Sequence, residues 1–240
     1  MSRTTESQSG SSRRADGRHQ QRRRGPGRGP GRRAVVLGAV AATLGGAGYL
    51  VHEDLERWWW RMPGNQRDRK PGAVDHPGAE WVPASEENYN LADRPYDWEI
   101  DKIVVHVVQG SYAVALKVFQ DPEHGAAAHY VVRAEDGHVA QTIRELDVGH
   151  HAGNMEYNRR SIGIEHEGFV DRPEGFTDAM YESSAQLAAG ICARYGIPVD
   201  REHIIAHHEV PGADHTDPGP HWDWDRYLSL VRRATASRRG

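Results

Sequence analysis

Apolar and polar positions along residues 81–234 predict a domain that mixes strands and helices. "KIVVHVV" (102–108) is a continuous β-branched run and predicts a strand that is buried on both faces. "AHYVVRAEDGHVAQTI" (128–143) predicts two strands around a turn at Asp136–Gly137. "HIIAHH" (203–208) predicts a further strand. These runs indicate a sheet whose strands come from distant parts of the chain.

Polar and apolar residues alternate in "SIGIEHEG" (161–168), which is typical of a strand. Ile162 and Ile164 share one face of this strand, and Glu165 lies on the other. The Glu165 carboxylate is therefore expected on the side of the sheet opposite the two isoleucines.

Three segments have the spacing of amphipathic helices, namely residues 111–120, 177–196 and 223–234. Their expected N-caps are Ser111, Thr177 and Asp223, and Gly196 is the expected stop of the second helix. In the first helix we expect the inward residues to be Val114, Leu116, Val118 and Phe119. Strands interleaved with helices predict an α/β or α+β sheet domain.

The chain before this domain predicts an export signal or a membrane anchor. Residues 1–33 hold ten arginines and only two acids, with little to bury, and predict a disordered arm. Residues 34–51 carry no charge and would form a helix of about 27 Å, close to the thickness of a bilayer core. Arg32–Arg33 ahead of this run resembles a twin-arginine signal. We expect a cytoplasmic arm and an exported C-terminal part, and leave open whether the helix is cleaved.

Composition narrows the partners that the folded part can have. The chain has a net charge of −4 although its N-terminal arm is strongly basic, so the remainder is acidic and is not expected to bind nucleic acid. Cys192 is the single cysteine, which excludes an internal disulfide. Residues 52–80 read as a juxtamembrane segment and linker ahead of the domain, and residues 235–240 as a tail.

Two histidines and one aspartate are candidates for a metal site. His106 lies in the middle of a buried strand, where an imidazole without a partner costs about 1–3 kcal/mol. His207 ends another apolar run, and Asp217 follows ten residues later, stiffened by Pro218. Two imidazoles and one carboxylate would make a three-ligand zinc site with one open position, which is typical of catalytic zinc. Spacing alone leaves open whether the three converge, and a core histidine bonded to a backbone carbonyl is the alternative for His106.

Six motifs in order resemble the zinc-dependent N-acetylmuramoyl-L-alanine amidases, a family that includes T7-type lysozyme and is related to peptidoglycan-recognition proteins. The motifs are "WVPASEENY", "KIVVHVVQGS", "AHYVVRAEDGHVAQ", "VGHHAGN", "YNRRSIGIEHEG" and "HHEVPGADHTDPGPHWDW". The resemblance covers about residues 81–232. It implies a central mixed β-sheet flanked by helices, and one zinc ion bound by His106, His207 and Asp217.

The resemblance also implies roles for three further residues. Glu165 matches a glutamate that resembles a general base, with Glu167 as the runner-up and a surface ion pair as the alternative. His215 stands where relatives often have a lysine that would stabilise an oxyanion. His151, in "HHAGN", matches a position near the substrate, and a loop histidine without a ligand is its alternative.

The implied function is hydrolysis of the amide bond between N-acetylmuramic acid and L-alanine in peptidoglycan, by an exported monomer. A peptidoglycan-binding module without activity is the alternative, because recognition relatives keep the fold but lose the zinc ligands. All three ligand positions are filled here, which favours the enzyme.

Overall fold

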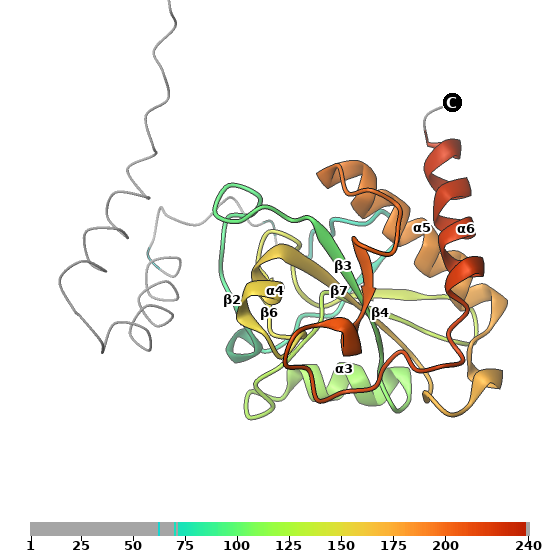
Figure 1. The fold of residues 1–240 in the computed structure, drawn as a ribbon. Helices are drawn as coiled ribbons and strands as arrows, with labels where there is room; N and C mark the ends of the chain where they lie inside the picture. Colours follow the sequence, from blue (N-terminus) through green and yellow to red (C-terminus); the bar gives the residue numbers. More distant parts are fainter. Residues whose placement is uncertain (1–61, 63–69, 71, 239–240) are drawn as a thin grey trace, which may run out of the picture. The chain divides into compact units, whose positions relative to one another are not determined.

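The computed structural model describes residues 62, 70 and 72–238 (Figure 1). The basic arm and the apolar run 34–51 lie outside this part of the chain, so export and anchoring stay predictions. No helix within the described part has the length and apolar character of a membrane span.

A six-stranded mixed sheet forms the centre of the domain, as the family resemblance implied. Its strands in spatial order are β1 (Glu80–Trp81), β5 (Val139–Gln141), β4 (Tyr130–Val132), β7 (Ser161–His166), β3 (Lys102–Val107) and β8 (Ile204–Ala206). Only β4 and β5 pair antiparallel in this sheet, and they are the predicted hairpin. A small antiparallel pair lies apart from it, formed by β2 (Tyr89–Asn90) and β6 (Val148–Gly149).

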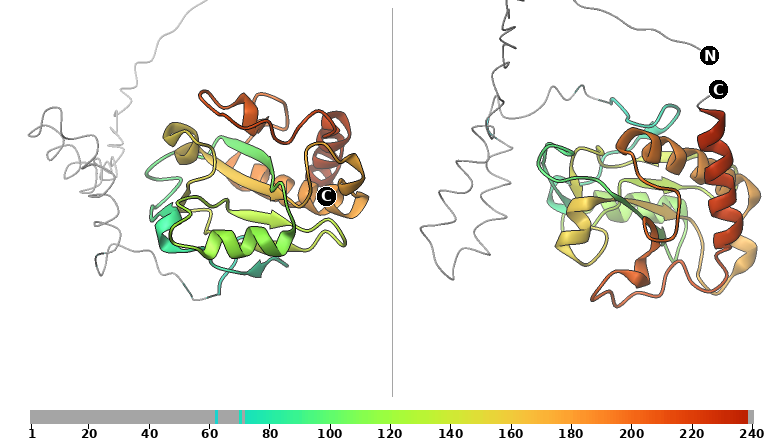
Figure 2. Two further views of the ribbon diagram at one scale, coloured as in Figure 1. Left: turned by 90° about the horizontal axis from the view of Figure 1, so that it is seen from below. Right: turned by 45° about the horizontal axis from the view of Figure 1, so that its top comes forward.

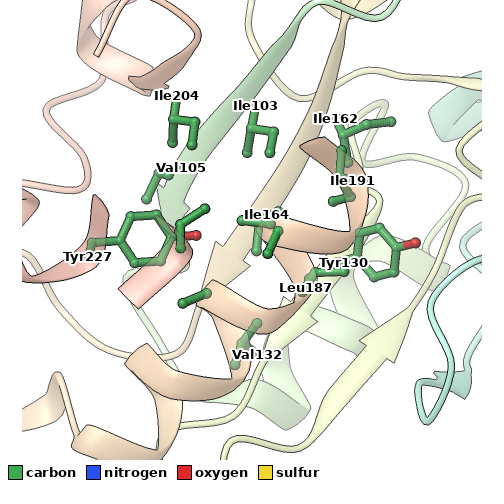
Figure 3. Packing of buried hydrophobic residues seen from close by; sticks show 14 of the residues in the cluster. Ile103, Val105, Tyr130, Val132, Ile162, Ile164, Leu187, Ile191, Ile204 and Tyr227 are labelled. Carbon is green, nitrogen blue, oxygen red and sulfur yellow. The ribbon is translucent and has the colours of Figure 1, made fainter. Parts of the chain in front are cut away.

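Helices cover both faces of the sheet (Figures 1 and 2). Apolar side chains of β3, β4 and β7 pack against α5 (Asp178–Tyr195) and α6 (Trp224–Ser237), and Figure 3 shows the resulting core. The opposite face holds a second cluster under α3 (Tyr112–Gln120). Because side chains alternate along a strand, Ile162 and Ile164 enter the first core and Glu165 belongs to the other face, as predicted.

The predicted helix starts are confirmed by their caps, whereas α6 continues to Ser237, beyond its predicted end at Ala234 and into the segment read as a tail. Ser111, Thr177 and Asp223 each accept a hydrogen bond from a backbone N–H in the first turn of their helices. Gly196 ends α5 with φ +74°, a left-handed conformation that favours glycine. The structure adds a short helix that the pattern did not predict, α4 (Met155–Arg160), capped by Asn154.

Two details of the predicted elements are wrong. Val114 does not point inward: its side chain is 54% exposed, and the buried residues of α3 are Tyr112, Ala115 and Phe119. Those three repeat at helical spacing, which leaves Val114 on the neighbouring stripe. The last predicted strand ends at Ala206, because the chain turns into a 3-10 helix, η3 (His207–Glu209). Two further 3-10 helices, η1 (Glu86–Asn88) and η2 (Pro173–Gly175), lie in the connections between strands and helices.

Part of the segment read as a linker packs on the domain. Asp75 receives hydrogen bonds from Arg144, from the side chain of Gln141 and from the backbone of Glu145. Although burial opposes it, these bonds lower the pKa of Asp75. Five residues later, β1 extends the sheet by pairing with β5.

Candidate active site

His106 faces the side of the sheet away from α5 and α6. Its neighbours Val105 and Val107 enter the core with those helices, so alternation turns the His106 ring to the opposite side. His106 is 1% exposed. Glu165 of β7 is its register partner across the parallel pair, which places a carboxylate beside the imidazole.

The structure brings His207 and Asp217 to His106. Asp217 Oδ2 lies 3.3 Å from His106 Nδ1, and Asp217 Oδ1 lies 3.0 Å from His207 Nδ1. One ligand atom from each of the three residues lies within 4.8 Å of the others, and all three side chains are buried. The β3 backbone also holds the carboxylate, since Val107 N donates to Asp217 Oδ2 at 3.2 Å. The three positions that the family resemblance implied as ligands therefore form one cluster.

This cluster fits zinc. Bonds of about 2.0 Å to four tetrahedral ligands place the ligand atoms about 3.3 Å apart, and the two imidazole–carboxylate contacts measure 3.0 and 3.3 Å. Two nitrogens and one oxygen are a donor set that zinc accepts, and three protein ligands leave one position for solvent or substrate.

The protonation states of the cluster suit a metal. Burial lowers the pKa of His106, although the nearby carboxylate of Asp217 acts in the other direction, so the ring is neutral near pH 7. For Asp217, burial alone would raise the pKa, but the contacts with His106 and His207 lower it below the ordinary value. A neutral imidazole and an ionised carboxylate are the forms that bind a cation.

Glu165 lies beside the cluster with one oxygen unused. Its Oε2 is buried and has no hydrogen-bond partner among the described residues. Burial, and secondarily the charge of Asp217, raises the pKa of Glu165 well above its ordinary value. This environment excludes the surface ion pair that was the alternative. Glu167 differs, because its oxygens accept from the backbone N–H groups of Tyr112 and Ala134 and so tie the start of α3 to the segment after β4.

His151 lies behind His106 and is buried. Its Nδ1 is 3.0 Å from His106 Nε2, and its Nε2 is 3.3 Å from Ser161 Oγ. Both ring nitrogens are therefore engaged within the protein. His151 also lines the pocket at this cluster, and its contact with substrate stays a prediction. Burial is the first cause that lowers the pKa of His151 well below its ordinary value, followed by the neighbouring histidines.

Two further histidines surround His207. His208 points away from the cluster, as expected, but through the 3-10 turn rather than strand alternation; its N and its Nδ1 donate to the Asp217 carbonyl oxygen at 3.2 and 3.1 Å. His215 stacks on His207 with ring centroids 4.6 Å apart and planes inclined by 18°. The His215 side chain is 62% exposed, so it stands at the rim, where it is open to a ligand. Its part in oxyanion stabilisation stays a prediction.

The cluster lines a groove of about 550 Å³, a size that suits a ligand of several chemical groups. His106, His207, Asp217, Glu165 and His215 all line it. Exposed Val114 and half-buried Val118 of α3 both contribute to the wall of the groove.

Ser161 and Gly163 are site residues that the pattern analysis missed. Both lie on the face of β7 that carries Glu165; Ser161 contacts His151, and Gly163 leaves room for the His151 ring because it has no side chain. The alternation in "SIGIE" held the signal, because every second residue of this strand faces the site.

Known proteins resemble this chain in sequence and fold. The family model described as N-acetylmuramoyl-L-alanine amidase matches residues 96–220. N-acetylmuramoyl-L-alanine amidase A of Achromobacter lyticus is 33% identical over 176 residues, which span 66% of this chain and 96% of that protein. The 1,6-anhydro-N-acetylmuramyl-L-alanine amidase AmpD of Haemophilus influenzae is 33% identical over 112 residues, 44% of this chain and 59% of that protein.

Solved structures agree with the sequence comparison. A crystal structure of a selenomethionine AmpD derivative superposes with a TM-score of 0.55 at 26% identity, and covers 68% of this chain and 98% of that one. The Staphylococcus aureus hydrolase AmiA, in complex with its ligand, shares the fold with a TM-score of 0.52 at 19% identity, over 62% of this chain and 79% of that one. The chain thus belongs to the N-acetylmuramoyl-L-alanine amidase family.

Proposed function

We propose that this protein hydrolyses the amide bond between N-acetylmuramic acid and L-alanine in peptidoglycan, with one zinc ion held by His106, His207 and Asp217. The observation that carries the proposal is the meeting of these three ligand atoms, within 4.8 Å of one another, at a groove that Glu165 also lines. A recognition module without activity would need neither the complete ligand set nor a buried carboxylate beside it.

The residues of the site divide the chemical work. Zinc at the three ligands would supply a Lewis acid for the amide carbonyl and would lower the pKa of a water molecule. Glu165 accepts the proton of the attacking water and returns it to the nitrogen of the leaving L-alanine. His215, at the rim, donates a hydrogen bond to the oxygen that becomes negative as the carbonyl is attacked. The products are the lactyl carboxylate of the sugar and the free amine of the stem peptide.

The apolar wall of the groove suits the sugar and the short side chains of a stem peptide. Val114 and Val118 of α3 line the groove together with the polar groups of the cluster. Such an arrangement of apolar wall and few polar groups is typical of sites that orient a ligand.

The test is an assay of the purified full-length protein on peptidoglycan. We expect new amino groups of L-alanine to appear, to vanish with a chelator and to return when zinc is added back. Release of reducing sugar ends in place of alanine amines would replace the amidase proposal with glycan cleavage. If the zinc-bound protein releases neither alanine amines nor reducing ends, the alternative function, a peptidoglycan-binding module without activity, takes the place of the amidase.

We further propose that the protein acts outside the cytoplasmic membrane as a monomer. The support is the sequence alone: Arg32–Arg33 precedes an uncharged run, and intact peptidoglycan lies on that side of the membrane. Fractionation of cells that make the protein should find the domain in the extracytoplasmic or membrane fraction, and a cytoplasmic domain would contradict this.

A further inference from the structure

We propose that Ser161 and His151 fix the His106 ring in the form that offers its Nδ1 to the metal, so that both are positioning residues for this ligand. The inference rests on the zinc site of the proposed function and deepens it. Its basis is a line of hydrogen bonds from the end of α4 to His106, in which each proton has one permitted direction.

The line begins at the Tyr157 carbonyl, in the last turn of α4. The last carbonyls of a helix have no partner within the helix, and a carbonyl can only accept. Ser161 Oγ lies 2.6 Å from this oxygen and is the group that satisfies it. A hydroxyl has one proton, so the Ser161 proton is directed to Tyr157.

The direction of the remaining bonds follows from that first proton. Having given its proton away, Ser161 Oγ can only accept, and the His151 Nε2 at 3.3 Å must carry a hydrogen. A neutral imidazole has a single N–H, so His151 Nδ1 is an acceptor. It lies 3.0 Å from His106 Nε2, which is therefore the nitrogen of His106 that carries the hydrogen. The His106 Nδ1 keeps its lone pair and faces Asp217.

Gly163 leaves the space that the His151 ring occupies. A Cβ atom at residue 163 would lie 2.6 Å from both Cγ and Nδ1 of His151, closer than side-chain atoms pack. The ring therefore needs glycine at this place in β7. The backbone of the loop is fixed too, since Asn158 Oδ1 accepts from the N–H groups of His151 and Ala152 at 3.1 and 2.7 Å.

The arrangement prevents a competing form of the site. If His106 carried its hydrogen on Nδ1, it would donate to Asp217, and that bond would have to break before a metal could bind. The line to Tyr157 keeps the hydrogen on Nε2, where it does not oppose the metal. Groups that orient a metal-binding histidine typically account for about 10–100-fold in affinity.

The test compares the zinc affinity of the full-length protein and of variants, by competition with a chromophoric chelator. We expect Ser161→Ala and His151→Leu to weaken zinc binding by about 10-fold or more, and His151→Gln to restore part of it, because an amide can accept and donate as the ring does. Ser184→Ala is the matched control. Ser184 is equally buried and bonds to His166 Nε2 at 2.6 Å, but His166 reaches only the carbonyl of His106. This control should lose stability and keep wild-type zinc affinity.

The result that overturns the proposal is wild-type zinc affinity in folded Ser161→Ala and His151→Leu proteins. A second readout does not depend on the variants: in the zinc-loaded wild type, long-range ¹H–¹⁵N spectra should show both His106 and His151 with hydrogen on Nε2. Hydrogen on Nδ1 of His151 would reverse the line and overturn the proposal. A wild type that binds no zinc would instead contradict the proposed function, so the two failures are distinct.

Discussion

His106 and Glu165 occupy matching register positions on the parallel strands β3 and β7, and face the same side of the sheet. The backbone ladder thus fixes the distance between the first candidate ligand and the candidate general base. Because both strands lie inside the sheet, with β8 and β4 outside them, the backbones of the two residues cannot shift without breaking the ladder. The rigid part of the fold therefore carries the part of the site whose geometry matters most.

Glu165→Gln should remove most of the activity and leave zinc binding intact. The amide cannot accept a proton, and loss of general base catalysis costs about 10²–10⁴-fold in rate. The folded state should be as stable as the wild type or more so, because a buried ionisable group with a raised pKa is removed. Turnover of peptidoglycan, zinc content and thermal unfolding together check this.

Glu167→Gln is the control for this substitution. Glu167 carries the same charge as Glu165 at the next position on the same face. Its oxygens accept hydrogen bonds from two backbone N–H groups, and it does not line the groove. We expect a loss of stability with kcat within a few-fold of the wild type. The reverse outcome, an active Glu165→Gln and an inactive Glu167→Gln, would transfer the role of base to Glu167.

His215 should contribute a hydrogen bond rather than a metal ligand. His215→Ala is expected to lower kcat by about 10²-fold, as for the loss of one oxyanion donor, with unchanged zinc content. His215→Lys should retain activity, because the ammonium group supplies a donor in the same place. If His215→Ala released the metal, the ring stacked on His207 would have to be counted among the groups that hold the site.

Arg94 should be essential for stability. It is 1% exposed, and its Nη1 donates to the carbonyls of Asn158, Arg159 and Ser161 at the end of α4. Arg94→Lys keeps the charge but loses the planar fork, and should lower the free energy of unfolding by about 3 kcal/mol or more, since hydrogen bonds to charged groups contribute about 1.5–3 kcal/mol each.

The matched arginine is Arg160, which forms a half-exposed ion pair with Asp101. Arg160→Ala should cost less than about 1 kcal/mol. Urea unfolding of both variants measures the difference, and equal losses would contradict the special place given to Arg94.

Acid should destabilise the metal-free protein through its buried histidines. Burial lowers the pKa of His129 and of His166 from 6.5 to about 3. Between these values the unfolded chain binds protons that the folded chain does not, so the free energy of unfolding falls as the pH falls below 6.5, down to about 3. Urea unfolding with a chelator at pH 7, 5.5 and 4.5 measures the slope. His129→Gln should make it shallower, and an unchanged slope would remove His129 from the explanation.

Strand alternation and helix-capping residues could be predicted from the sequence. Alternation placed Glu165 on the face opposite Ile162 and Ile164, and the capping residues Ser111, Thr177 and Asp223 marked helix starts, because both signals are local. The ligand set came from resemblance, since His106 and Asp217 are far apart in the sequence and only the fold brings them together.

Contacts between distant segments account for what sequence analysis did not find. His151 reads as a loop residue, and nothing near it in the chain indicates that its ring reaches His106 and Ser161. Val114 reads as a core residue because periodicity cannot tell a helix stripe facing the core from one facing a groove. Arg94 bonds to carbonyls 64 to 67 residues away, so its role depends on the folded arrangement.

The most direct test of the proposed centre is the zinc content of the purified protein and of three single variants, His106→Ala, His207→Ala and Asp217→Ala, by metal analysis after dialysis. We predict one zinc per wild-type chain and a strong loss in each folded variant, with amidase activity falling in parallel. A full equivalent of zinc in folded Asp217→Ala, or an active wild type without metal, would contradict the proposed centre.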